Sequence, residues 1–196
     1  ITDSNLYKIG LAFFSESKKI TRSVKLIKIP IPKTHGIEPP ENISHEMLKY
    51  DVILMPTTKS LTHTNATKVA CKKGARVASM PGITPDMINR ALNVDFDEIA
   101  KSNKKLISKL KNKSIVRITT EKGTDVEFYL KGRKWKSDDG LYTKKGVCGN
   151  LPAGEIFIAP LEGKTNGTII VDASVGGLGK VDKEIKIKIK NGVIEY

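Results

Sequence analysis

The sequence predicts an α/β protein with two parts. The first is an N-terminal layered α/β domain, Rossmann-like or flavodoxin-like, over residues 1–113, and the second is a mainly antiparallel β region over residues 114–196. Through about Lys113, compact apolar runs alternate with helical patterns, which is typical of βαβ units around a parallel sheet. After Lys113, apolar residues recur at every second position between glycine-containing turns, which indicates antiparallel strands.

The first part is expected to alternate short strands with helices, each bounded by capping residues, Pro or Gly. Its expected elements, in order, are the end of a first strand at residues 1–3, a short helix at 10–15, a strand at 23–31, a helix capped by Asn42 or Ser44 and ending at Tyr50, a strand at 51–56, a helix at 60–73 closed by Gly74, a strand at 75–80, a helical turn capped by Thr84, and a helix at 96–110.

The second part is expected to consist of strands at residues 114–120, 124–130, 167–175 and 184–190. In the last of these, Lys and Ile alternate, so one face of the strand should be in contact with water. The closing residues NGVIEY are typical of a turn and the second arm of a hairpin. Because both ends resemble interrupted strands, we expect the chain to be a segment of a longer protein, and the domain over residues 114–196 to be the incomplete start of a catalytic domain.

Composition and charge narrow the classes of function. The chain has 196 residues, 39% of them hydrophobic, and a net charge of +13 from 29 Lys and 5 Arg against 21 acidic residues. Specific nucleic-acid contacts favour the forked Arg side chain, so scattered lysines indicate solvated faces, and no specific nucleic-acid partner is expected. No apolar run reaches the roughly 18 residues of a membrane span, and no signal peptide is visible. We therefore expect a cytoplasmic protein without a membrane partner, with Cys71 and Cys148 as buried free thiols.

Common catalytic motifs are missing from the sequence. It has no GxGxxG, GxxxxGK[ST], HExxH or GxSxG pattern, and its three histidines, His35, His45 and His63, are isolated from one another. The segment Thr62-His63-Thr64 precedes a predicted helix, where free N–H groups could bind an anion. Helix capping by Ser60 or Thr62 is the favoured interpretation of this segment.

The strongest chemical signal is the stretch GNLPAGEIFIAP at residues 149–160. Pro152 and Gly154 should shape a tight bend that presents the carboxylate of Glu155, with an apolar stretch directly after it. A carboxylate in this position suits a hard divalent metal or a general base. We expect it to face a concave, largely apolar pocket.

The segment GNLPAGEIFIAPLEGKTNGTIIVDAS closely resembles the metal-binding turn of the aminopeptidase T family, the thermophilic-type, leucyl aminopeptidase-like metallopeptidases. The stretch DVILMPTTKSLTHTNATKVACKKGARVASMPGITPDM also resembles the N-terminal α/β domain of that family. The resemblance implies a homodimeric aminopeptidase that acts on peptide substrates with divalent ions (Zn, Co, Mn or Mg), with Glu155 as a metal ligand. The family's other ligands lie further along than Tyr196, so this chain alone is expected to be inactive.

Three functions follow from these observations. The leading hypothesis is an aminopeptidase in which metal-bound water attacks the first peptide bond of the substrate. The second is a related non-haem iron dioxygenase that acts on a dihydroxypyridine. The third is a non-catalytic binding module that keeps the fold without its site. A facial set of two His and one carboxylate would favour iron, and a fuller carboxylate-rich set would favour two metals.

Overall fold

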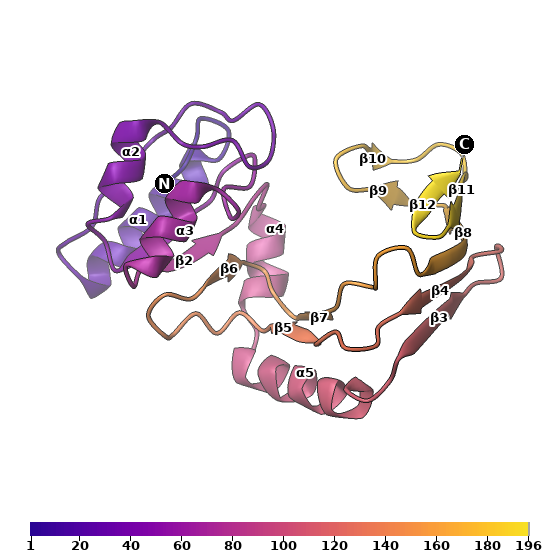
Figure 1. The fold of residues 1–196 in the computed structure, drawn as a ribbon. Helices are drawn as coiled ribbons and strands as arrows, with labels where there is room; N and C mark the ends of the chain where they lie inside the picture. Colours follow the sequence, from indigo (N-terminus) through magenta and orange to yellow (C-terminus); the bar gives the residue numbers. More distant parts are fainter. Residues whose placement is uncertain (196) are drawn as a thin grey trace. The chain divides into compact units, whose positions relative to one another are not determined.

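A computed structural model describes residues 1–195 of the chain (Figure 1). The chain divides into two compact units, one formed by Ile1–Asn103 with Asp138–Glu155 and the other by Lys104–Ser137 with Ile156–Tyr196. Its elements are α1 (Tyr7–Ile20), α2 (Glu41–Met47), β1 (Val52–Met55), α3 (Asn65–Lys72), β2 (Arg76–Ser79), α4 (Pro85–Met87), the π-helical turn η1 (Ile88–Leu92), α5 (Phe96–Leu110), β3 (Ile115–Thr119), β4 (Asp125–Tyr129), β5 (Lys136–Asp138), β6 (Cys148–Asn150), β7 (Glu155–Phe157), β8 (Thr165–Val171), β9 (Ser174–Val175), β10 (Gly179–Lys180), β11 (Ile185–Lys190) and β12 (Val193–Glu195).

The first unit contains a parallel sheet with the strand order β1-β2-β6. β1 and β2 are short parallel strands joined by α3, which is the βαβ arrangement expected from their sequence. β6 comes from a distant part of the chain and pairs with β2 in parallel, with Cys148 opposite Val77. On the side of β1 away from β2, Thr2 forms a parallel bridge with Lys28.

The core of this unit lies around the parallel sheet. Its fully buried members come from both strands and from the surrounding helices, and they include Met47, Met55, Leu61, Ala70 and Val77. Strands in the middle of a parallel sheet carry nearly continuous apolar runs, and β1 has such a run, VILM.

The second unit is built on an antiparallel sheet with the strand order β12-β11-β8-β4-β3. Its core is small and includes the buried residues Val126 and Leu130. In β11, Lys186, Lys188 and Lys190 are exposed, so the wet face predicted for this strand is present. The predicted hairpin of NGVIEY also forms, as β11 pairs with β12, although Tyr196 lies outside the described residues.

The α/β class and the change from parallel to antiparallel pairing are therefore confirmed, and no helix follows Ser114 within residues 1–195. The predicted boundary at residue 113 lies within the first segment of the second unit.

Several expected element bounds were wrong. The helix expected at residues 10–15 runs from Tyr7 to Ile20, and Asp3 orders the turn before it by accepting from the N–H groups of Asn5 and Leu6. Residues 23–31 form no continuous strand and take part only in the bridge at Lys28. α2 begins after Pro40, and the Ser44 hydroxyl donates to the Pro40 carbonyl (3.3 Å) instead of capping the helix.

None of the helices described within residues 1–195 is both long and apolar enough to cross a membrane.

Candidate functional site

The carboxyl edge of the parallel sheet is a candidate ligand-binding site, because open α/β sheets bind their ligands there. Polar side chains lie at this edge, at the last positions of the strands or shortly after them: Asp3, Thr57, Thr58, Ser79 and Asn150. Three of them, Asp3, Thr57 and Ser79, are fully buried.

Asp3 is already engaged within the protein. Its Oδ1 accepts hydrogen bonds from the backbone N–H groups of Asn5 (3.1 Å) and Leu6 (3.3 Å), in the turn just before α1. The Thr58 hydroxyl also donates to Oδ1 (3.0 Å), and the Thr58 N–H donates to Oδ2 (2.5 Å). A buried carboxylate with four donors has a structural role, joining α1 to the end of β1.

Ser79 and Asn150 lie opposite each other at the ends of β2 and β6. The Asn150 Oδ1 accepts a hydrogen bond of 2.6 Å from the Thr62 hydroxyl, so the loop before α3 is tied to β6. The Ser79 Oγ is buried and has no hydrogen-bond partner among the described residues. This part of the edge therefore retains one polar group that is not satisfied internally.

The segment 138–155 returns to the first unit and carries the NLPAGE motif. It is held by hydrogen bonds from Leu151 N to Ser79 O (2.8 Å), from Gly154 N to Asp138 O (2.9 Å), and from Asn103 Nδ2 to Glu155 O (3.0 Å). Gly154 has a φ of +136°, a conformation that favours glycine, so the predicted bend requires this residue.

Glu155 itself is exposed, and it lines neither of the two cavities described in this chain. The expectation that its carboxylate faces a concave apolar pocket was therefore wrong. The turn fixes the backbone of Glu155 through its carbonyl group and leaves the side chain in solvent. Gly154, its neighbour, does border the smaller and more open cavity beside Ile99 and Asn103.

The hydroxyl group of Tyr142 also holds this segment. Its hydroxyl lies 2.6 Å from the Asn150 carbonyl oxygen and 2.8 Å from Asp138 Oδ1, and its single proton can be donated to one of them at a time. Burial, followed by the nearby Asp138 carboxylate, raises the pKa of Tyr142 far above its usual range. The phenol therefore stays protonated and acts as a donor that holds the end of β6.

The acidic, His and Cys side chains of the described residues are dispersed. Within residues 1–195, no group of three His, Cys, Asp or Glu side chains is arranged to hold a metal ion. His35, His45 and His63 are exposed, and the Nδ1 of His35 accepts a hydrogen bond from Ser60 N (3.0 Å).

The segment Thr62-His63-Thr64 caps α3, as the sequence analysis favoured, but the capping residue is neither Ser60 nor Thr62. Thr64 is the N-cap, and its hydroxyl accepts from Thr67 N (3.2 Å). The anion position is filled by Glu38, whose carboxylate accepts from Asn65 N (2.5 Å) and Ala66 N (3.1 Å). Glu38 was missed because it lies 27 residues upstream of Asn65.

The two thiols are both free but differ in exposure. Cys71 is buried on α3, as predicted, whereas Cys148 on β6 is exposed, contrary to prediction, because β6 is an edge strand of the parallel sheet. Burial, followed by the Cys148 thiol, raises the pKa of Cys71 to about 12, so Cys71 is an inert thiol at neutral pH.

Comparison with known proteins gives one family and one fold. A family model described as 2,5-dihydroxypyridine 5,6-dioxygenase (NicX) matches residues 17–196. Among solved structures, 2,5-dihydroxypyridine dioxygenase from Pseudomonas putida KT2440 is similar with a TM-score of 0.78 and 16% identity. The similarity covers 98% of this chain and 59% of that chain, so this chain spans less than two thirds of its structural relative. No curated protein matches the sequence.

The family match overturns the aminopeptidase hypothesis. The resemblance to aminopeptidase T, and with it the hydrolase activity and the peptide substrate, is contradicted by a family model that describes a dioxygenase. The error came from a short turn motif, since a bend that presents a carboxylate suits more than one metal chemistry. The dihydroxypyridine dioxygenase, raised above as the second hypothesis, agrees with the match.

Proposed function

The chain belongs to the 2,5-dihydroxypyridine 5,6-dioxygenase family, and from this membership we propose that the complete protein is a dioxygenase that adds both atoms of O2 to a dihydroxypyridine ring. The observation that carries the proposal is the length of the family match, which takes in residues 17–196. It therefore includes both the parallel sheet and the antiparallel sheet. The similar fold of the Pseudomonas putida enzyme supports it.

The proposed reaction needs a divalent metal. We propose that this metal is a non-haem iron(II) ion, which would activate O2. Residues 1–195 hold no group of three suitable side chains, and the chain covers 59% of its structural relative, so we propose that the other ligands come from another part of the complete protein. Glu155 is the residue of this chain that we propose to contribute. Its backbone is fixed by Asn103, and its carboxylate is free in solvent to meet such a partner.

The proposal is tested by assaying the full-length protein with 2,5-dihydroxypyridine under air, after loading with iron(II) in the absence of oxygen. We expect loss of the substrate's absorbance together with uptake of one O2 per substrate. With labelled O2, both labelled atoms should appear in the product, because a dioxygenase adds both oxygen atoms to its substrate and reduces neither of them to water.

Two controls separate this function from the alternatives. Iron(II)-free protein should be inactive and should recover when iron(II) is restored, and peptides with free N-termini should not be hydrolysed. If the iron-loaded protein consumes no O2 with any dihydroxypyridine isomer, the proposed function is wrong.

We further propose that the complete protein is a cytoplasmic homodimer with a Rossmann-like or flavodoxin-like first unit. The closed symmetry of a homodimer is the commonest arrangement among soluble oligomers. Light scattering after size-exclusion chromatography tests the assembly, and a monomeric mass at micromolar concentration would contradict it.

A further inference from the structure

Two thiols of the first unit lie in contact although they are far apart in the sequence. Cys71 belongs to the last turn of α3, and Cys148 is the first residue of β6. Their thiols are hydrogen-bonded to each other, and neither is part of a disulfide. No third His, Cys, Asp or Glu side chain joins them to make a metal site within residues 1–195. Two free thiols in contact can be joined by oxidation to a disulfide bond.

The alternation of side chains along β6 explains why Cys148 faces α3. Successive side chains of a strand point to opposite faces of the sheet. The Asn150 Oδ1 accepts a hydrogen bond from the Thr62 hydroxyl (2.6 Å), in the loop before α3. Gly149 faces the other way, toward Tyr142, whose hydroxyl oxygen would lie 2.3 Å from a Cβ atom at this position. Cys148 is two residues before Asn150, so it points to the same side of the sheet, where α3 lies.

Cys71 belongs to the face of α3 that packs against the sheet. The buried residues of this helix lie three or four positions apart and are Ala66, Thr67, Ala70 and Cys71. Because α3 connects two parallel strands, it runs against the strand direction, and its last turn lies near the start of each strand. β6 is parallel to β2, so the end of α3 and the start of β6 meet.

The backbones of the two segments also meet around the thiols. Gly146 N donates to Gly74 O (3.1 Å), in the turn directly after α3. A Cβ atom at Gly146 would lie 3.0 Å from the Cys71 carbonyl oxygen, so the chain passes close to the end of the helix just before it reaches Cys148. There it enters the sheet, with Cys148 opposite Val77 of β2. The contact between the thiols is therefore set by the backbone on both sides.

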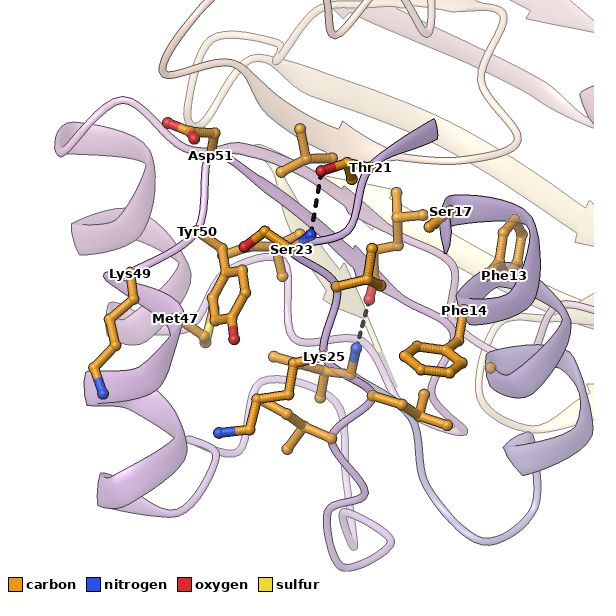
Figure 2. Close-up of a pocket in the computed structure, with 18 of the residues that line it drawn as sticks. Phe13, Phe14, Ser17, Thr21, Ser23, Lys25, Met47, Lys49, Tyr50 and Asp51 are labelled. Atoms are coloured by element: carbon orange, nitrogen blue, oxygen red, sulfur yellow. Dashed lines mark hydrogen bonds between the residues drawn. The ribbon is translucent and has the colours of Figure 1, made fainter. Parts of the chain in front are cut away.

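The two thiols differ in their access to solvent. Cys71 is 8% exposed, whereas Cys148 is exposed at the edge of the sheet. Neither thiol lines the largest cavity described in the first unit, a groove of about 520 Å³ beside β1 (Figure 2). Because β2 separates β1 from β6 in the sheet, a reagent reaches Cys148 directly from solvent and not through that groove.

We propose that Cys71 and Cys148 form a reversible redox site, in which a small-molecule disulfide such as oxidised glutathione converts the two thiols into an internal disulfide that fastens β6 to α3. β6 leads directly into the NLPAGE turn, so the bond would fix the strand from which this turn starts. In a reducing compartment a disulfide of this kind forms transiently, when the supply of oxidised small thiols rises. The site does not depend on the reaction proposed above.

The reaction consists of two successive thiol–disulfide exchanges. The Cys148 sulfur first attacks one sulfur of oxidised glutathione, forms a mixed disulfide with it and releases one molecule of glutathione. The Cys71 sulfur then attacks the Cys148 sulfur and displaces the second molecule of glutathione. The two protein thiols lose two electrons and two protons in total, and oxidised glutathione takes them up as it becomes two molecules of reduced glutathione.

The second exchange should be the slower one. Burial, followed by the Cys148 thiol, raises the pKa of Cys71 to about 12, so few Cys71 thiols are ionised at neutral pH. Once Cys148 carries glutathione it has no charge that opposes this ionisation, and burial is the remaining cause. Contact with Cys148 offsets the small ionised fraction, because an attack between groups held together has a high effective concentration. Closure of the disulfide should therefore be faster at higher pH.

The test exposes the full-length protein to oxidised glutathione under nitrogen, so that this disulfide is the sole oxidant. Free thiols are then blocked by alkylation, and non-reducing peptide mapping by mass spectrometry identifies each product. We expect a linked pair of peptides that contain Cys71 and Cys148, and its loss when dithiothreitol is added. The linked form should have a midpoint of thermal unfolding higher by about 5 °C or more, because the bond restricts the unfolded chain.

Matched serine variants separate the two thiols. Cys71→Ser should keep glutathione bound at Cys148, because the second thiol is gone. Cys148→Ser should take up glutathione at least about tenfold more slowly than Cys71→Ser does, because Cys71 is buried. Peptide mapping of the wild-type protein does not depend on how these variants fold. The proposal would be overturned by wild-type protein that leaves both thiols unmodified, by wild-type protein that keeps glutathione on Cys148 as stably as Cys71→Ser does, or by a linked form that unfolds at the same temperature as the reduced protein.

Discussion

At the scale of single residues, Glu155 combines a fixed backbone with a free carboxylate. We expect Glu155→Gln in the full-length protein to lower dioxygenase turnover by about 10- to 100-fold if the carboxylate contributes to the metal site. The substitution keeps the shape of the side chain and removes its charge. O2 uptake and bound iron should be measured together, with circular dichroism to check folding.

Glu121→Gln provides the matched control, because Glu121 is also exposed but lies in the turn between β3 and β4. It should leave turnover and iron content unchanged. Wild-type turnover and iron content in Glu155→Gln would make Glu155 a turn residue without a part in the chemistry.

At the scale of elements, β6 is fixed by the close packing of Tyr142 on Gly149. A Cβ atom at Gly149 would lie 2.3 Å from the Tyr142 hydroxyl oxygen, and hydrogen bonds hold that ring in place. We expect Gly149→Ala to destabilise the protein by about 1 to 3 kcal/mol through overpacking. In a Tyr142→Ala background the same substitution should cost much less, because the clash is gone. Additive losses in a double-mutant cycle measured by urea unfolding would exclude this explanation.

The start of α3 depends on a residue that is distant in sequence. The carboxylate of Glu38 accepts two backbone N–H groups at the positive end of the helix dipole. Glu38→Gln should lower the free energy of unfolding by about 0.5 to 1 kcal/mol, with faster amide exchange at Asn65 and Ala66. Glu16→Gln, in the exposed last part of α1, is a suitable control because it lies away from any helix start. Equal effects of the two substitutions would count against the capping role.

At the scale of the whole molecule, the charge of +13 raises the question of nucleic-acid binding. The excess comes from lysines, several of which lie on the exposed face of β11. We expect duplex DNA to bind weakly, with a dissociation constant above about 1 μM at physiological salt and with a steep loss of affinity as salt increases. Fluorescence anisotropy with two unrelated duplexes at two salt concentrations measures this. Tight binding that survives moderate salt and prefers one duplex would contradict it.

Local patterns in the sequence were sufficient for most elements. The helix Phe96–Leu110 was predicted with its bounds, as were the capping of α4 by Thr84 and the hairpin of β11 and β12. Each of these depends on spacing and capping within a few residues. The bend at Gly154 was also predictable, since its φ of +136° favours glycine.

Contacts between distant segments were decided only by the tertiary structure. Cys148–Asn150 becomes the third strand of the parallel sheet, and Glu38 reaches the start of α3, because folding brings together residues that no local pattern connects. The same reason explains the error at Glu155. The sequence by itself determined the α/β class and a turn that presents a carboxylate, but the surroundings of that carboxylate depend on which segments pack around it, and in this chain it is left exposed to solvent.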